Sequence, residues 1–174
     1  MENNKQSPLQ PGDHGLIADV VHRYAWALDT GDADAFARCF TADGELLWDA
    51  FDAPYQWKGA DELRRFAAFL RDLPTTAGRQ HHVSNLVIDA EGGAVRGRSY
   101  VAVMVRQGAA PYPLTVLGWY EDVYRRTDAG WRIARRVIRD WSGPVLAGMA
   151  GQTGAREARP MPEALAGLGG RRLA

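Results

Sequence analysis

Apolar residues recur every three or four positions over residues 16–29, a spacing that gives a helix one buried face. The same spacing predicts a short second helix over 33–40 and a third over about 59–73. Gly31 and Pro74 stand where the first and third of these helices should end. The front of the chain is therefore predicted to be helical, with three apolar helix faces turned to one core.

Period-two alternation replaces the helical spacing after Gly78, and it indicates strands of an antiparallel sheet. A shorter strand of mixed polarity is expected earlier, after a turn at residues 41–44. The predicted strands are residues 45–51, 79–90, 94–106, 113–126 and 131–140. Helices gathered in front of a meander predict an α+β domain whose curved sheet wraps the helices.

The pattern divides the chain into three stretches. Residues 1–13 are polar and predict a flexible arm that ends near Asp13, a candidate helix N-cap. Residues 14–146 form the folded domain. Residues 147–174 have little pattern, so this tail is expected either to be disordered or to pack on a neighbouring subunit.

Composition narrows the classes of function. The 174 residues include 21 basic and 21 acidic side chains, and a net charge of zero argues against a nucleic-acid partner. No apolar run is long enough to span a bilayer, and the first residues lack the apolar core of a signal peptide. With Cys39 as its one cysteine, the protein is expected to be cytoplasmic, with no membrane partner. Six Trp, six Tyr and five Phe predict a heavy core or an aromatic-lined cavity.

Two residues are candidates for acid–base chemistry. Asp29 closes the first helix on or beside its apolar stripe, where an unpaired buried carboxylate would be costly. His81 and His82 are adjacent in a strand, so they face opposite ways and cannot share one metal. We expect His81 to face inward, where a carboxylate can orient it as a general base. The alternatives are an exposed Asp29 in the turn and a hydrogen-bonded core histidine.

Arg136 and Tyr24 are candidates for stabilising a developing negative charge. Arg136 lies between apolar neighbours on the last strand, and a guanidinium offers several fixed donors to an oxyanion. Its alternative role is to pair with Glu121 or Asp122. Tyr24 precedes Asp29 by about one turn and can donate its phenol to a substrate oxygen, or simply pack in the core.

The sequence has no nucleotide-binding glycine loop, no zinc-protease motif, no cysteine cluster and no serine nucleophile motif. A site that works without cofactor or metal is therefore expected.

Four segments, 24–32, 40–44, 79–85 and 130–136, together resemble the SnoaL-like branch of the nuclear transport factor 2-like superfamily. The resemblance covers about residues 14–146. It implies a cone-shaped, curved antiparallel sheet around three N-terminal helices, with an internal pocket. It also implies a homo-oligomer, either a dimer or a trimer.

Within that family, scytalone dehydratase, bile acid 7α-dehydratase and hexachlorocyclohexane dehydrochlorinase use an Asp–His dyad that removes a proton so that water or chloride can leave. By resemblance, Asp29 and His81 fall on this dyad. Tyr24 falls on a tyrosine of the bile acid enzyme, and Arg136 on an arginine of the dehydrochlorinase. The resemblance therefore implies a catalytic set of His81, Asp29, Tyr24 and Arg136.

Two departures from the family argue against scytalone as the substrate. Trp48 stands where the dehydratases have a pocket tyrosine, and Leu117 is nearest to the second histidine of scytalone dehydratase. The pocket is expected to be apolar and to suit a ring-bearing substrate. Its predicted lining residues are Trp26, Trp48, Phe51, Phe66, Asn85, Leu117, Tyr120 and Ile138.

These observations favour a cofactor-independent lyase or isomerase, dehydratase-like, that acts on a small hydrophobic and cyclic or polyketide-like molecule. Two alternatives remain open. The same dyad can promote the aldol closure of a polyketide cyclase, and domains of this shape also bind hydrophobic ligands without catalysis.

Overall fold

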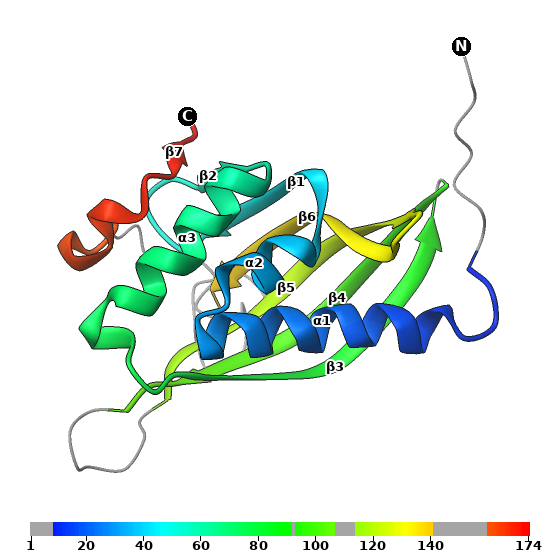
Figure 1. Cartoon of the computed structure of the whole chain (residues 1–174), viewed down its shortest axis with the longest axis horizontal. Helices are drawn as coiled ribbons and strands as arrows, with labels where there is room; N and C mark the ends of the chain where they lie inside the picture. Colours follow the sequence, from blue (N-terminus) through cyan, green and yellow to red (C-terminus); the bar gives the residue numbers. More distant parts are fainter. Residues whose placement is uncertain (1–8, 92, 107–113, 141–159) are drawn as a thin grey trace, which may run out of the picture.

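The computed structural model describes residues 9–91, 93–106, 114–140 and 160–174, and Figure 1 shows its helices lying on one face of a curved sheet. The helices are α1 (Asp13–Thr30), α2 (Ala33–Arg38) and α3 (Ala60–Asp72), with short 3-10 helices η1 (Pro74–Thr76) and η3 (Glu163–Leu168). The strands are β1 (Phe40–Asp49), β2 (Tyr55–Lys58), β3 (Gln80–Glu91), β4 (Ala94–Met104), β5 (Leu114–Thr127), β6 (Gly130–Asp140) and β7 (Arg171–Arg172).

The helices form where the apolar spacing predicts them. The stripe on α1 is buried, from Ile17 to Leu28, and the helix stops at Gly31, which takes the left-handed conformation with φ 76°. Asp32 caps α2, since its side chain accepts a hydrogen bond from the Ala35 amide at 2.8 Å. Asp13 is the first residue of α1 and not its N-cap, a position held by Gly12. No helix of the described ranges is long and apolar enough to cross a membrane.

The sheet confirms the predicted α+β class but not a purely antiparallel pairing. Its seven strands run in the order β3-β4-β5-β6-β1-β2-β7, and β1 pairs with β6 in parallel. The cause is the connection through α3. This helix links β2 to β3, which lies at the far edge of the sheet and runs in the same direction as β2. The meander from β3 to β6 then returns to β1 in parallel orientation. The expected turn at 41–44 is an irregularity within β1, where the register with β6 shifts between Phe40 and Glu45.

The end of the chain contains structure that the sequence pattern did not predict. Residues 160–174 pack on α3 and β2 of their own chain, and β7 adds a short strand beside β2. The buried Trp57 indole donates a hydrogen bond to the Leu168 carbonyl at 2.8 Å. A β-carbon at Gly170 would lie 2.5 Å from the Trp57 ring, so this close approach requires glycine. Residues 147–159 of the predicted tail lie outside the described residues, and packing on a neighbouring subunit stays a prediction.

The core lies between α1, α3 and the concave face of the sheet. Aromatic rings fill much of it. Phe36 stacks on Phe66 with ring centroids 5.8 Å apart, and Trp57 meets Phe66 edge-on at 4.8 Å. The aromatic surplus of the sequence therefore serves packing, and some of the same rings, Phe66 among them, also border a cavity.

Candidate active site

A cavity of about 320 Å³ is lined by residues of α1, α3 and the sheet. This volume is at the small end of the range for ligand-binding pockets. The walls of the cavity are mainly apolar and aromatic. Of the predicted pocket residues, it is lined by Trp48, Phe51, Phe66, Tyr120 and Ile138. Tyr24 and His81, predicted as catalytic, also line it. Pro162 and Leu165 of the C-terminal segment complete one side of the wall.

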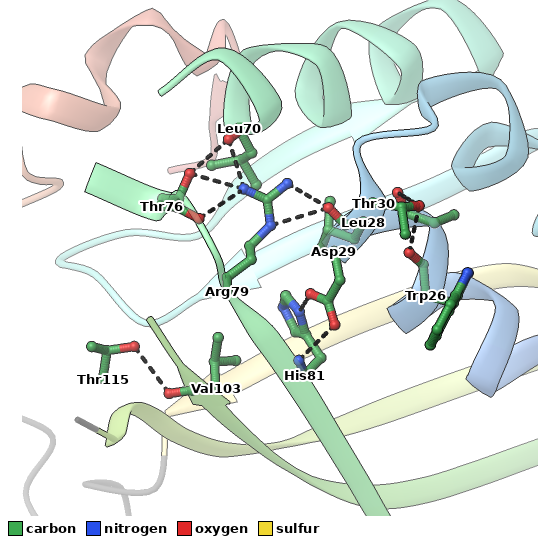
Figure 2. Close-up of polar contacts among 11 residues, drawn as sticks. Trp26, Leu28, Asp29, Thr30, Leu70, Thr76, Arg79, His81, Val103 and Thr115 are labelled. Carbon is green, nitrogen blue, oxygen red and sulfur yellow. Dashed lines mark hydrogen bonds and ion pairs between the residues drawn. The ribbon is translucent and has the colours of Figure 1, made fainter. Parts of the chain in front are cut away.

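The structure brings Asp29 and His81 together, as predicted. Asp29 is the penultimate residue of α1, and His81 is the second residue of β3. His81 Nδ1 lies 2.5 Å from Asp29 Oδ1, and the His81 backbone amide donates to Asp29 Oδ2 at 2.8 Å. The two side chains are only 10% and 17% exposed. Asp29 thus holds His81 at two points, through the ring and through the backbone (Figure 2).

This clamp fixes how the imidazole can react. A carboxylate beside Nδ1 favours the tautomer whose proton is on Nδ1, because that proton becomes the hydrogen bond. Nε2 then carries the lone pair and can accept a proton from a molecule in the cavity. His82 is exposed and faces the opposite way, as the alternation of a strand requires.

Arg79 is a buried residue near the dyad to which sequence reasoning assigned no role. Its guanidinium donates from Nε to the Leu28 carbonyl at 3.1 Å, and from Nη1 to the Leu70 carbonyl at 2.6 Å and to Thr76 Oγ1 at 2.8 Å. It also lines the cavity. The sequence pattern around Arg79 does not indicate its partners, because they lie on α1, α3 and η1 and are brought together only by the fold.

Tyr24 lies on α1 five positions before Asp29 and is fully buried. Burial raises the pKa of Tyr24 to about 12, although the nearby positive charge of Arg136 opposes this. Its hydroxyl has no hydrogen-bond partner within the part of the chain that is described. The phenol is therefore neutral at physiological pH and has a proton to donate.

Arg136 does not line the cavity, which corrects its predicted role as a direct oxyanion stabiliser. It is fully buried and bonds Asp122 at two points, Nε to Oδ1 at 2.8 Å and Nη2 to Oδ2 at 2.7 Å. Its guanidinium lies 4.1 Å from the Tyr24 ring centroid and 4.0 Å from that of Tyr120. The alternative pairing with Asp122 is therefore present, and Arg136 supports the cavity from behind two tyrosines.

Three predicted pocket residues lie elsewhere. Trp26 is 74% exposed, because two positions along a helix turn it about 200° from Tyr24. Leu117 is 45% exposed on the outer face of the sheet, since it is out of phase with the inward-facing Tyr120. Asn85 is exposed with φ 54°, where the pairing of β3 with β4 shifts register and interrupts the alternation.

The charged side chains of the described lining all have partners. Arg79 bonds helix carbonyls, and Arg139 bonds Glu121 at 3.0 Å and Asp49. In the described part of the chain, no three His, Cys, Asp or Glu side chains gather as a metal-binding group. The arrangement is suited to a neutral molecule that meets one imidazole beside a carboxylate.

A family model and several solved structures are similar to this chain. A family model described as a SnoaL-like domain matches residues 13–137. A variant of Rv3472 from Mycobacterium tuberculosis, a protein of unknown function, is 27% identical over 77% of this chain and 78% of its own, with a TM-score of 0.65. An NTF2-like protein with a cystatin-like fold from Novosphingobium aromaticivorans is 25% identical over 80% and 86%, with a TM-score of 0.65.

A candidate scytalone dehydratase from the same Novosphingobium species covers 86% of this chain and 93% of its own, with a TM-score of 0.62. Its 24% identity shows a shared fold. No curated protein matches the sequence.

Proposed function

Because the chain belongs to the SnoaL-like domain family, we propose that the cavity is the active site of a cofactor-independent lyase or isomerase. His81 is the general base, and Asp29 orients it. The observation that carries this proposal is the two-point clamp of Asp29 on His81, which leaves Nε2 as the proton acceptor at a cavity wall.

The reaction begins with the transfer of a proton from carbon to His81 Nε2. The C–H electron pair moves toward an adjacent carbonyl, and Asp29 stabilises the imidazolium that forms. In an elimination, that pair becomes a C=C bond while the leaving group departs with its own bonding pair. The proton on Nε2 then passes to the leaving group or, in an isomerisation, to another carbon.

Tyr24 is proposed to stabilise the negative charge that develops on the carbonyl oxygen. Its phenol is neutral and donates to no described residue, so it can donate to an oxyanion without first breaking a hydrogen bond of its own. Arg136 acts through the rings of Tyr24 and Tyr120 and keeps them in place.

The substrate is proposed to be a small, neutral, ring-bearing carbonyl compound. The wall offers aromatic surface from Trp48, Phe51 and Phe66, and its charged groups are already paired. An aldol cyclisation would start from the same enolate. The substrate of a cyclase would differ from that of a lyase in having a second carbonyl for the enolate to attack, in place of a leaving group.

We expect the protein to catalyse exchange of the α-hydrogens of 2-tetralone and 2-indanone with deuterium in D₂O, followed by proton NMR. These bicyclic ketones test proton removal without knowledge of the natural leaving group. No enhancement over buffer with either ketone contradicts the proposal and favours a binding domain.

Tyr24→Phe is expected to lower that exchange rate by about 10²-fold, the loss typical of one oxyanion donor. Its free energy of unfolding should stay unchanged or rise, because the lost hydroxyl makes no hydrogen bond within the described structure. Exchange kinetics and urea denaturation measure the two effects. A variant that is destabilised and fully active would show that the hydroxyl serves packing alone.

A further inference from the structure

Arg79 joins the two chain segments that supply the dyad. It is 7% exposed, and the hydrogen bonds of its guanidinium go to uncharged oxygens of α1, α3 and Thr76. Figure 2 shows the guanidinium between the Leu28 and Leu70 carbonyls, with Asp29 and His81 directly below. Leu28 precedes Asp29 by one position, and Arg79 precedes His81 by two.

These carbonyls are ones that a helix cannot satisfy by itself. The last four C=O groups of a helix lack partners in that helix, and Leu28 and Leu70 belong to the final turns of α1 and α3. A positive charge is also favourable at the negative end of a helix dipole. Arg79 therefore caps two helix ends at once, which needs the wide, planar fork of a guanidinium.

The electrostatic surroundings agree with this position. Burial lowers the pKa of Arg79, and the nearby Asp29 carboxylate acts in the opposite direction by favouring the charged form. Arg79 thus lies close enough to Asp29 for their charges to interact, while its donors are directed at the helix ends.

We propose that Arg79 is the positioning residue that holds the end of α1 against the start of β3, and so keeps Asp29 in contact with His81. This inference rests on the proposed function, because the dyad is the pair being positioned. Without the guanidinium, the end of α1 loses its link to β3 through Leu28, and Asp29 loses the constraint that aligns both of its oxygens with His81.

The test is the imidazole proton resonance of His81 Nδ1, observed in ¹⁵N-histidine-labelled protein without any ligand. We expect Arg79→Met to lose this resonance. Arg79→Lys should move the chemical shift of this proton toward that of a solvent-exposed histidine, because a single ammonium cannot cap two helix ends. Arg71→Met is the matched control, since Arg71 is an exposed arginine of the last turn of α3 that pairs with Asp72. It should leave the resonance unchanged.

Retention of the wild-type resonance in either folded Arg79 variant overturns the inference. If Arg79→Met does not fold, Arg79→Lys decides by the same criterion. A wild-type protein that lacks the resonance has no dyad, and the proposed function fails together with the inference. A wild-type protein that shows the resonance but exchanges neither ketone loses the proposed function alone, while the positioning role is still decided by the Arg79 variants.

Discussion

Replacing His81 with alanine is expected to slow deuterium exchange of 2-tetralone by about 10²–10⁴-fold, the usual contribution of one general base. The side chain is mostly buried, but within the described part of the chain its ring bonds a single residue, Asp29, which is itself at the end of a helix. The fold should therefore persist, with an unchanged circular dichroism spectrum. The loss should appear in kcat, because the apolar walls that bind the ketone remain.

His82→Ala is the matched control for this prediction. His82 is the adjacent histidine of the same strand, and its exposed side chain faces away from the cavity. Its replacement should leave both exchange and stability unchanged. Equal exchange rates for His81→Ala and the wild type would show that another group removes the proton.

Arg136→Met is expected to lower the free energy of unfolding by about 3–5 kcal/mol, the cost of leaving one partner of a buried ion pair uncompensated. Arg136 and Asp122 both have fully buried side chains, and the pair is bidentate. The variant also removes the cation between the Tyr24 and Tyr120 rings. Urea denaturation followed by tryptophan fluorescence measures the loss.

The double variant Asp122→Asn/Arg136→Met separates charge from packing. It removes the negative charge that the single variant leaves buried, while asparagine can still accept the hydrogen bond from the Tyr124 hydroxyl, which lies 2.6 Å from Asp122. We expect the double variant to be more stable than Arg136→Met. If it is instead less stable by the sum of two independent losses, the pair contributes through packing and not through compensation of charge.

Elements set by local periodicity were predictable from the sequence. The stripe on α1 placed Asp29 at a helix end, and strand alternation placed His81 opposite to His82. Proximity of Asp29 and His81 also depends on the path of the chain, for which the family resemblance supplied the expectation. In the structure the two side chains are in contact, with His81 Nδ1 2.5 Å from Asp29 Oδ1.

Features set by nonlocal contacts were not predictable in this way. The parallel pairing of β1 with β6 follows from the crossover by α3, and the position of Asn85 follows from a register shift that alternation does not reveal.

The choice of Asp122 over Glu121 as the partner of Arg136 is different. Both acids are on β5, but alternation puts Asp122 on the concave face and Glu121 on the outer one. That distinction was available from the sequence.

Long-range ¹H–¹⁵N NMR spectra of ¹⁵N-histidine-labelled protein show directly which nitrogens of the His81 ring carry a proton. We expect His81 to be protonated on Nδ1 and bare on Nε2, and we expect Asp29→Asn to change this pattern. A His81 ring protonated on Nε2 in its neutral form, or a spectrum that Asp29→Asn leaves unaltered, would contradict the claim that Asp29 holds His81 as the base of an active site.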